Sequence, residues 1–400
     1  MKILFILSRF PYPLEKGDKL RAYQHILHLK ASGHEVHLAA ISDIKVKQSE
    51  LDKIIPLCSS VTVIPLSVFD VAINVIASFF RKLPIQAGYF YSSKNQEKIN
   101  SVISKVNPDL IYCQLIRTAL YIQKHKSFPR VIDYQDAFSK GTFQRMHNAP
   151  WWLKPIFKRE LPLVKKLEEQ SYDWFDGHLI ISKQDREALA VSHDKSIAVV
   201  PNGVETNYFY PDPSEKKIDV TFVGNMNYPP NVDGACFLVE EIMPLVWKNF
   251  PDAIVQIAGA NPSKKVRELA SDQVFVTGWI PDIRHSYRST KVFVAPMRIG
   301  TGLQNKLLEA MAMGIPCVTT PLSFEPLKAN TGIDILVGSD AAAIAGKISE
   351  LLKSEDLRNN IGRKGLEFVV SNYSMEHSRI LLDKEIKNAL VKFNQGRGHQ

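Results

Sequence analysis

Cysteine is scarce in this 400-residue sequence, and its four copies lie far apart. Cys58, Cys113, Cys236 and Cys317 form no C-x-x-C pair, which disfavours a structural zinc site and a disulfide framework. A reducing, cytoplasmic setting fits this usage best.

Long apolar runs are also missing. No stretch approaches the roughly 20 apolar residues that a membrane-spanning helix needs. The first residues, MKILFILSRFPYP, form an apolar run that is too short for a signal peptide. They predict a buried first strand instead.

Two common nucleotide-binding motifs are absent as well. A dinucleotide fingerprint needs three spaced glycines, but the loop after the first strand has one, Gly17, and residues 300–305 read GTGLQN. No Walker A sequence occurs. These absences disfavour an NAD enzyme and a P-loop ATPase.

Basic residues, by contrast, are in surplus. The net charge of +9 and the pI near 9.1 favour anionic partners, such as nucleic acid, acidic lipid or phosphorylated small molecules. The alternative is a surface that is charged only for solubility. At 400 residues the chain is too long for one ordinary core, which predicts two domains.

Short apolar runs alternate with amphipathic helical stretches along the whole chain, which predicts doubly wound parallel sheets. The first set of predicted strands comprises residues 2–7, 35–41, 61–66, 109–114, 130–135 and 178–182. The second set comprises residues 219–224, 253–259, 274–279, 292–296, 317–320 and 334–338.

An interruption rich in Pro, Asn and charge, at 199–217, separates the two sets. It predicts an N-terminal domain over 1–198 and a C-terminal domain over 199–373, both Rossmann-like and facing a central cleft. The charged tail, 374–400, is expected to form a helix that crosses back to the first domain. Ligands of such sheets bind beyond the carboxyl ends of the strands, so the loops there are candidate sites.

The segment RIGTGLQNKLLEAM, 298–311, is the most informative of these loops. Gly300 and Gly302 allow a tight turn, and the helix that follows presents free N–H groups to an anion. Lys306 and Glu309 are three residues apart and share a helix face. The alternative is a plain helix start, in which Thr301 and Gln304 form a capping box.

This segment is one of several that resemble a known family. PMRIGTGLQNKLLEAMAMGIPCVTT, VVPNGVETNYFYP, TFVGNMNYPPN and VFVTGWIPDI look like the C-terminal half of retaining glycosyltransferases of family 4, group 1, which have the GT-B fold. The resemblance covers 197 to about 375, and the N-terminal half matches more loosely.

The resemblance implies roles for residues of the C-terminal loops. Glu309 matches the glutamate that accepts hydrogen bonds from the ribose of a nucleotide sugar, while Thr301 stands where the family has a second glutamate. Arg298 and Lys306 would neutralise the leaving diphosphate. The remaining donor-binding positions that it implies are Gly17, Asn225, Ile280, Gly300, Thr301, Gly302, Leu303 and Gln304.

The resemblance also bears on the acceptor side. Gln135 stands where the family has a histidine beside the reacting sugar, and Asp136 is the candidate acceptor-side group, with Asp133 nearby. The alternative is that these aspartates only cap a turn at a strand end. Metal-dependent sugar transferases use a D-x-D pair, which this sequence lacks, so no metal and no other cofactor are expected.

Two apolar and basic stretches, 68–83 and 151–170, lie in the predicted acceptor domain. Tryptophans beside lysines suit an anionic membrane surface. The alternative is that both helices pack on the sheet and their lysines are solvated.

The resemblance implies a retaining glycosyltransferase of bacterial surface-polysaccharide type, and the missing D-x-D pair adds the expectation that it is metal-independent. Its expected partners are a UDP-, GDP- or ADP-sugar, a glycan or lipid-linked acceptor and an anionic membrane surface, but no nucleic acid. The expected location is the cytoplasm, peripherally on the inner face of the membrane. A nucleotide-sugar epimerase of the same fold and a non-catalytic binding component of a glycan assembly complex stay open as alternatives.

Overall fold

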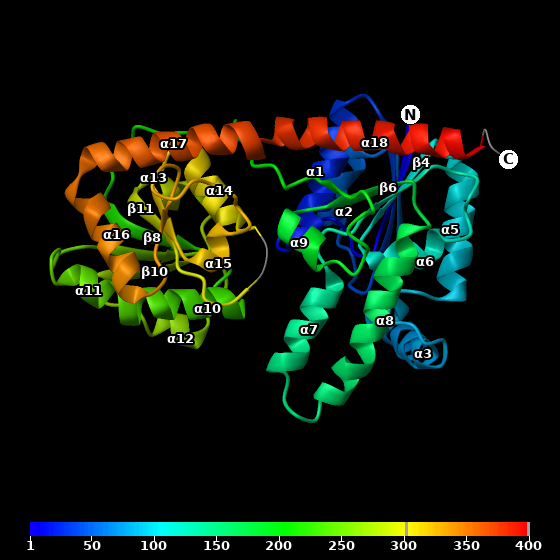
Figure 1. Ribbon diagram of the computed structural model, residues 1–400, viewed down its shortest axis with the longest axis horizontal. Helices are drawn as coiled ribbons and strands as arrows, with labels where there is room; N and C mark the ends of the chain where they lie inside the picture. Colours follow the sequence, from blue (N-terminus) through cyan, green and yellow to red (C-terminus); the bar gives the residue numbers. More distant parts are fainter. Residues whose placement is uncertain (301–302, 398–400) are drawn as a thin grey trace. The chain divides into compact units, whose positions relative to one another are not determined.

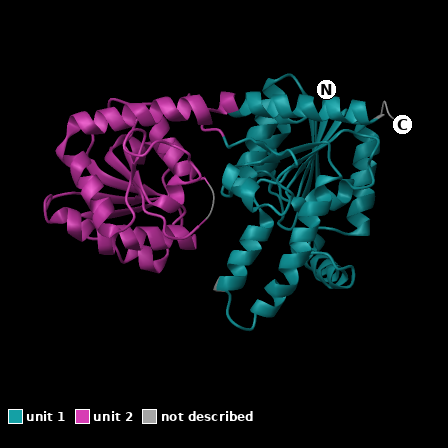
Figure 2. Cartoon of the chain, viewed as in Figure 1, with its two compact units in different colours: residues 1–202, 378–400 teal, residues 203–377 magenta. Residues whose placement is uncertain are grey.

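The computed structural model describes residues 1–300 and 303–397, and the chain divides into two compact units (Figure 2). Unit 1 comprises Met1–Asn202 and Ser378–Gln400, and unit 2 comprises Gly203–His377. Each unit is an α/β structure built on one parallel sheet.

The sheet of unit 1 has seven strands in the described part of the chain, in the order β3-β2-β1-β4-β5-β6-β7. All neighbouring strands pair in parallel. Their bounds are β1 Lys2–Leu7, β2 Glu35–Ser42, β3 Ser60–Pro65, β4 Leu110–Gln114, β5 Arg130–Asp133, β6 Gly177–Ile180 and β7 Ala198–Val199.

Helices cover both faces of this sheet (Figure 1). Ile3, Phe5 and Leu7 of β1 pack on one face with helices α1 and α18, while Leu4 and Ile6 pack on the other with α5 and α6. This burial on two sides explains why the strands are apolar throughout rather than at alternate positions. The helices are α1 Gly17–Ala31, α2 Gln48–Ile54, α3 Val68–Phe80, α4 Ile85–Gly88, α5 Ser93–Val106, α6 Ile116–Ile122, α7 Phe138–Asn148, α8 Lys154–Tyr172, α9 Lys183–Ala188 and α18 Met375–Arg397.

The sheet of unit 2 has six parallel strands among the described residues, in the order β10-β9-β8-β11-β12-β13. Their bounds are β8 Ile218–Val223, β9 Val255–Ala258, β10 Val274–Gly278, β11 Thr290–Ala295, β12 Cys317–Thr319 and β13 Leu336–Val337. The helices are α10 Pro229–Cys236, α11 Met243–Trp247, α12 Lys264–Arg267, α13 Arg284–Arg288, α14 Asn305–Ala312, α15 Pro321–Phe324, α16 Ala341–Lys353 and α17 Glu355–Tyr373, with a π-helical turn at Phe237–Ile242.

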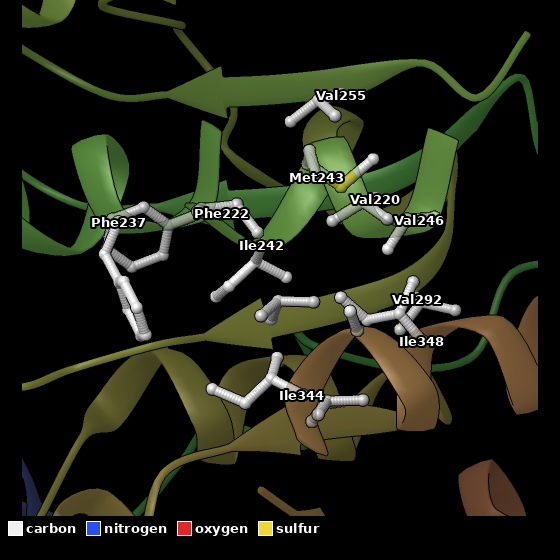
Figure 3. Close-up of a cluster of buried hydrophobic side chains, with 14 of the residues drawn as sticks. Val220, Phe222, Phe237, Ile242, Met243, Val246, Val255, Val292, Ile344 and Ile348 are labelled. Atoms are coloured by element: carbon white, nitrogen blue, oxygen red, sulfur yellow. The ribbon is translucent and has the colours of Figure 1, made fainter. Parts of the chain in front are cut away.

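The core of unit 2 also has two layers. Val292 and Val294 of β11 contact the side chains of α11 and α16 (Figure 3), whereas Phe293 and Ala295 face α14 on the other side of the sheet. The alternation along β11 is the period of two that every strand has. It places α14, the helix of the segment 298–311, directly against the sheet.

The predicted fold class is confirmed in its elements. Each of the twelve predicted strands lies within two residues of an observed one at both ends, and β7 is the one observed strand that the sequence did not predict. At two residues, β7 is too short to show a pattern. The tail from Met375 is helical, and its part from Ser378 belongs to unit 1.

The strand order places a switch point in each sheet. In unit 1 the order reverses between β1 and β4, and in unit 2 between β8 and β11. Open parallel sheets bind ligands beyond the carboxyl ends of such strands. The loops after β1, β8 and β11 are therefore where a site is expected.

No helix in the described residues is both long enough and apolar enough to cross a membrane.

Candidate functional site

Three glycines, Gly224, Gly259 and Gly278, bring the backbones of the loops after β8, β9 and β10 into close contact. Gly224 N donates to Ala258 O at 3.0 Å, and Gly259 N donates to Gly278 O at 3.1 Å. Gly259 has φ +134°, and a Cβ there would lie 1.8 Å from the carbonyl oxygen of Gly224. Only glycine fits this close approach of two backbones. The backbone beside the switch point is thereby fixed.

Asn225, a predicted donor-binding residue, begins the turn after β8. Its side-chain oxygen accepts from Asn227 N at 3.1 Å, and its carbonyl oxygen accepts from Asn231 Nδ2 at 3.0 Å. Asn231 Oδ1 also accepts from Lys306 Nζ at 2.6 Å. Asn231 thus ties the turn to helix α14. Asn231 is missing from the predicted set, because a single asparagine in the first turn of α10 shows no pattern until its partner helix is known.

Lys306 lies at the centre of this arrangement. It is half-buried, and its Nζ is 4.7 Å from the ring centroid of Phe222 and 3.8 Å from Met297 Sδ. Burial lowers the pKa of Lys306 to about 7, although the carboxylate of Glu309 opposes this shift. A partly desolvated ammonium of this kind gains strongly from a bound anion, which would restore its charge.

Glu309 lies on the same side of α14 as Lys306, close enough for each to affect the pKa of the other. Its Oε2 accepts a hydrogen bond from the hydroxyl of Tyr287 at 2.7 Å, and Tyr287 is fully buried. Burial raises the pKa of Glu309, while Tyr287 and Lys306 lower it in part. The carboxyl group is therefore held in one orientation.

The turn before α14 is described only in part. The helix begins at Asn305 with Gln304 as its N-cap. The capping box between Thr301 and Gln304 depends on Thr301 and stays a prediction. Thr301 and Gly302 lie outside the described residues. Gly300 has φ +125°, which favours glycine, and a Cβ there would meet only Pro230, at 3.8 Å.

Arg298 carries less free charge than the sequence suggests. Its guanidinium donates to Asp233 at 2.9 and 3.1 Å and to Glu241 at 2.9 Å. It also lies 4.2 Å from the ring centroid of Phe237. Two carboxylates thus already balance this cation, so the role predicted for it at the leaving diphosphate stays a prediction, and Lys306 is the better candidate.

The remaining donor-side residues of unit 2 are partly packed. Ile280 and Leu303 are half-buried against the hydrophobic cluster that contains α14. Gln304 is half-buried at the start of that helix. Trp279, beside Ile280, is exposed. Ile280, Leu303 and Gln304 thus lie near the carboxyl edge of the sheet, and their donor-binding role stays a prediction.

In unit 1, Gly17 is the first residue of α1 and is exposed. A Cβ at Gly17 would meet nothing within 4 Å, so its backbone is open to a ligand. Asp18, in the same first turn, accepts from Arg9 Nη1 at 2.6 Å. This ion pair places one cation and one anion beside Gly17, the predicted donor-binding residue of this loop.

Asp136 follows β5 in unit 1. The residue as a whole is exposed, but protein atoms pack around its carboxyl group, and the carboxylates of Asp185, Asp18 and Glu168 act on its charge. This burial, followed by the neighbouring negative charges, raises its pKa to about 7, against the opposing effect of Arg117. A carboxyl group with a pKa near neutrality is suited to exchange a proton.

Asp133, the second aspartate of that strand end, has a structural role. It is fully buried and accepts from Arg21 at 2.6 and 3.0 Å and from the hydroxyl of Tyr112 at 3.0 Å. Arg21 also donates to the carbonyl of Val200 and to Asn202. This buried network joins α1 to β5. Asp133 Oδ1 also accepts from Gln135 N at 3.1 Å, so Asp133 caps the turn at the strand end as well.

The predicted residues therefore form two groups. Asn225, Gly300, Lys306 and Glu309 lie around the switch point of unit 2, and Gly17 and Asp136 lie at strand ends of unit 1. Within residues 1–300 and 303–397, no group of three His, Cys, Asp or Glu side chains could hold a metal ion.

Two family descriptions match most of the chain. Residues 20–208 match "Glycosyltransferase Family 4", and residues 217–354 match "Glycosyl transferases group 1". The order of the two matches follows the order of units 1 and 2.

Two sequence relatives have descriptions that name a cps region or capsular polysaccharide biosynthesis. An uncharacterized 44.6 kDa protein in the cps region of Klebsiella pneumoniae is 22% identical over 397 residues, covering 93% of this chain and 96% of that protein. The capsular polysaccharide biosynthesis glycosyltransferase CapM of Staphylococcus aureus is 27% identical over 173 residues, which is 40% of this chain and 44% of CapM.

Solved structures share the fold. A glycosyltransferase of Rickettsia africae aligns with a TM-score of 0.70 at 16% identity, covering 97% of this chain and 98% of its own. HepE of Anabaena, solved in complex with UDP-glucose, aligns with a TM-score of 0.67 at 14% identity, covering 97% of this chain and 99% of its own.

Proposed function

This chain belongs to the group 1 glycosyltransferases of family 4, and we propose that it moves a sugar from a nucleotide diphosphate sugar to a glycan or lipid-linked acceptor with retention of configuration. The observation that carries the proposal is the pairing of Lys306 with Asn231 beside Glu309, at the switch point of unit 2. Arg298, whose charge two carboxylates already balance, is proposed as a second cation near the diphosphate.

Lys306 would stabilise the leaving group. When the bond between the anomeric carbon and the phosphate oxygen breaks, the electron pair stays on the diphosphate, and its new negative charge needs a fixed positive partner. The ammonium of Lys306 and the N–H groups at the start of α14 supply that partner. Binding of the diphosphate would raise the lowered pKa of Lys306 and keep it protonated.

Glu309 would hold the nucleoside. Its carboxyl group accepts hydrogen bonds from the ribose hydroxyls, and the buried hydroxyl of Tyr287 positions it for that task. Asn225, Ile280, Gly300, Leu303 and Gln304 would line the donor. Thr301, Gly302 and, in unit 1, Gly17 are further proposed donor-binding residues.

The acceptor step would need little from the protein. The acceptor's hydroxyl oxygen bonds to the anomeric carbon on the face from which the diphosphate departs. The departing phosphate oxygen takes the hydroxyl proton. Asp136 would accept a hydrogen bond from the acceptor, which its carboxylate form does best.

Relatives in capsule regions support a role in surface-polysaccharide synthesis. A UDP-sugar is the first donor to test, because HepE binds UDP-glucose with the same fold. We place the reaction on the cytoplasmic side, at the inner face of the membrane, where a lipid-linked acceptor would be found.

A donor screen tests the proposal. The purified protein is incubated with UDP-, GDP- and ADP-sugars, without acceptor and with lipid-linked acceptors, and released nucleotide and transferred sugar are both measured. Release of nucleotide together with sugar transfer supports a transferase. Conversion of the donor into its epimer supports the epimerase alternative, and tight donor binding without any turnover supports a binding protein.

Two further measurements address the mechanism. EDTA should leave turnover unchanged if no metal takes part, and a loss that Mg²⁺ restores contradicts the metal-independent mechanism. NMR of the product should show the anomeric configuration of the donor. An inverted product contradicts the proposed same-face attack.

A further inference from the structure

Helix α3, Val68–Phe80, turns its polar side to the protein. Asn74 and Ser78 are buried, and Asn74 Nδ2 donates to the carbonyl of Tyr89 at 3.2 Å. A Cβ at Gly88 would lie 2.2 Å from Ser78 Cβ, so α3 packs tightly against α4. A helix on a water-facing surface normally buries its apolar side instead. The orientation of α3 is therefore inverted.

The apolar side of α3 faces solvent. Phe69 and Phe80 are 82% and 80% exposed. The exposed large apolar side chains of this helix are Val68, Phe69, Ile73, Ile76, Phe79 and Phe80. Because positions 69, 73, 76 and 80 are three or four residues apart, they form one stripe. For α3, the alternative in which its apolar side chains pack on the sheet is wrong.

A second apolar group lies in the connection between α7 and α8 (Figure 1). Trp151 and Trp152, in the connection between the two helices, are 78% and 60% exposed. Arg159 of α8 lies 4.3 Å from the ring centroid of Phe79 and donates to its carbonyl at 3.2 Å. This contact makes α3 and the beginning of α8 parts of one surface, called here the α3–α8 surface.

Positive charges outnumber negative ones around this surface, and the one acidic residue in α3, Asp70 in its first turn, lies 3.9 Å from Lys94. Residues 71–96 contain three Lys or Arg side chains, residues 137–159 contain five, and neither range contains an acidic residue. Arg81, Lys82, Lys154 and Lys158 are exposed. The first two end α3 and the other two begin α8, so cations border the apolar stripe.

We propose that the α3–α8 surface docks on an anionic lipid bilayer, with α3 lying in the plane of the interface. An in-plane helix of this kind buries its apolar side among the acyl chains while basic residues contact lipid phosphates. Exposed tryptophans suit the same depth, since the ring is apolar and its N–H finds polar partners. A second copy of the chain fits less well, because a twofold contact would set the cationic borders against each other.

This proposal adds a membrane partner to the proposed function. It rests on that function only for the expectation that the acceptor is lipid-linked. Lipid binding can be measured without any donor sugar. An inactive protein that binds vesicles and an active one that does not are therefore distinguishable outcomes.

Vesicle flotation at low salt tests the surface with the full chain. One vesicle preparation contains phosphatidylcholine alone, and a second contains phosphatidylcholine with phosphatidylglycerol. The protein should float with the anionic vesicles, remain mostly unbound with the neutral ones, and lose binding as salt rises.

Two double variants locate the contact. Phe69→Ser with Phe80→Ser and Arg81→Glu with Lys82→Glu should each lower the partition onto anionic vesicles by about tenfold or more, since both apolar area and charge contribute. All four side chains are exposed, so the fold should persist, which thermal unfolding can verify. Val391→Ser, at an exposed aliphatic residue of α18 in the same unit, is the matched control and should bind as the wild type does.

The proposal is overturned if the wild-type protein does not float with anionic vesicles at low salt. It is also overturned if the two double variants float as well as the wild type. A wild-type dimer in light scattering that the Phe69→Ser, Phe80→Ser variant makes monomeric would also overturn it, because the α3–α8 surface would then be an interface between copies.

Discussion

At the scale of single residues, the site depends on charges that the protein holds in unusual protonation states. Lys306 and Glu309 lie one helical turn apart, and burial lowers the pKa of the first while it raises that of the second. Both shifts move the pair toward neutrality in the free protein. An anionic ligand would reverse the shift at Lys306, because it stabilises the ammonium form, and this makes the donor step sensitive to pH.

The first prediction concerns Lys306. Its pKa of about 7 means that its charged form is lost as pH rises through neutrality, so kcat/KM for the donor should fall above about pH 7 if the cation is required. Lys306→Arg retains charge and should remove this alkaline limb of the pH profile. Lys306→Met should lower kcat by roughly a hundredfold or more, as loss of one transition-state charge contact commonly does.

The acid limb of the same profile provides the control. Asp136 has a pKa near 7 as well, and its ionised form is lost as pH falls, so Asp136→Asn should remove the acid limb and leave the alkaline one. Both groups titrate within roughly pH 6 to 9. If kcat/KM of the wild type does not change over that range, both assignments are contradicted.

Glu309 carries the second prediction. Glu309→Gln keeps the size of the side chain and an acceptor for Tyr287, but it loses the charge, and the donor KM should rise by about tenfold, equivalent to about 1.4 kcal/mol of lost hydrogen bonding. Tyr287→Phe should raise KM less, because it only releases the orientation of Glu309. Titration calorimetry with the free nucleotide checks both, and unchanged affinity in both variants contradicts the ribose contact.

At the scale of elements, close backbone contact shapes the donor side more than any side chain does. The turns after β8 and β9 touch at Gly224 and Gly259, and the turn after β8 is tied to α14 through Asn231. These contacts join elements that are far apart in the sequence. They fix the position of the Lys306 ammonium relative to the turn after β8.

The third prediction is that Gly259→Ala disrupts the donor side. The new Cβ would overlap the carbonyl oxygen of Gly224, and φ +134° is unfavourable for alanine, so the two turns must separate. The free energy of unfolding should fall by roughly 1 to 3 kcal/mol, and nucleotide affinity should fall with it. Gly346→Ala is the matched control, since a Cβ there meets nothing within 4 Å. Equal stability of the two variants would contradict this account.

The elements also show how far a pattern in the sequence reaches. Apolar runs such as 2–7 and 292–296 predicted β1 and β11, because burial on both faces leaves a continuous signal. The pattern at 298–311 indicated helix α14 but did not give its first residue, which is Asn305. The same kind of pattern described 68–83 as amphipathic but did not say which side of α3 meets the protein.

At the scale of the whole molecule, the chain is divided so that its last helix completes the first unit. Leu382, Ile386 and Ala389 of α18 are buried in the same cluster as Ile3 and Leu29. Residues from the two ends of the sequence thus form one core. The stability of unit 1 depends on a segment that lies beyond all of unit 2 in the sequence.

The fourth prediction follows from this arrangement. Leu382→Ala should destabilise unit 1 by about 2 to 5 kcal/mol, the usual effect of a cavity in a packed core. In hydrogen exchange, amides of β1 should lose protection while those of β8, in unit 2, keep theirs. Val391→Ala, on the exposed side of α18, should change neither. Equal loss of protection in both units would contradict the division.

The sequence by itself determined the order of strands and helices, the family, and the pair Lys306 and Glu309. All three depend on local periodicity or on short motifs, which neighbouring residues carry without help from the rest of the chain. Only the tertiary structure decided that Asn231 meets Lys306, that carboxylates already balance Arg298, that Asp133 is a structural anchor, and that α3 turns its apolar side outward. Those properties arise from contacts between distant segments, and no local pattern encodes which segments will meet.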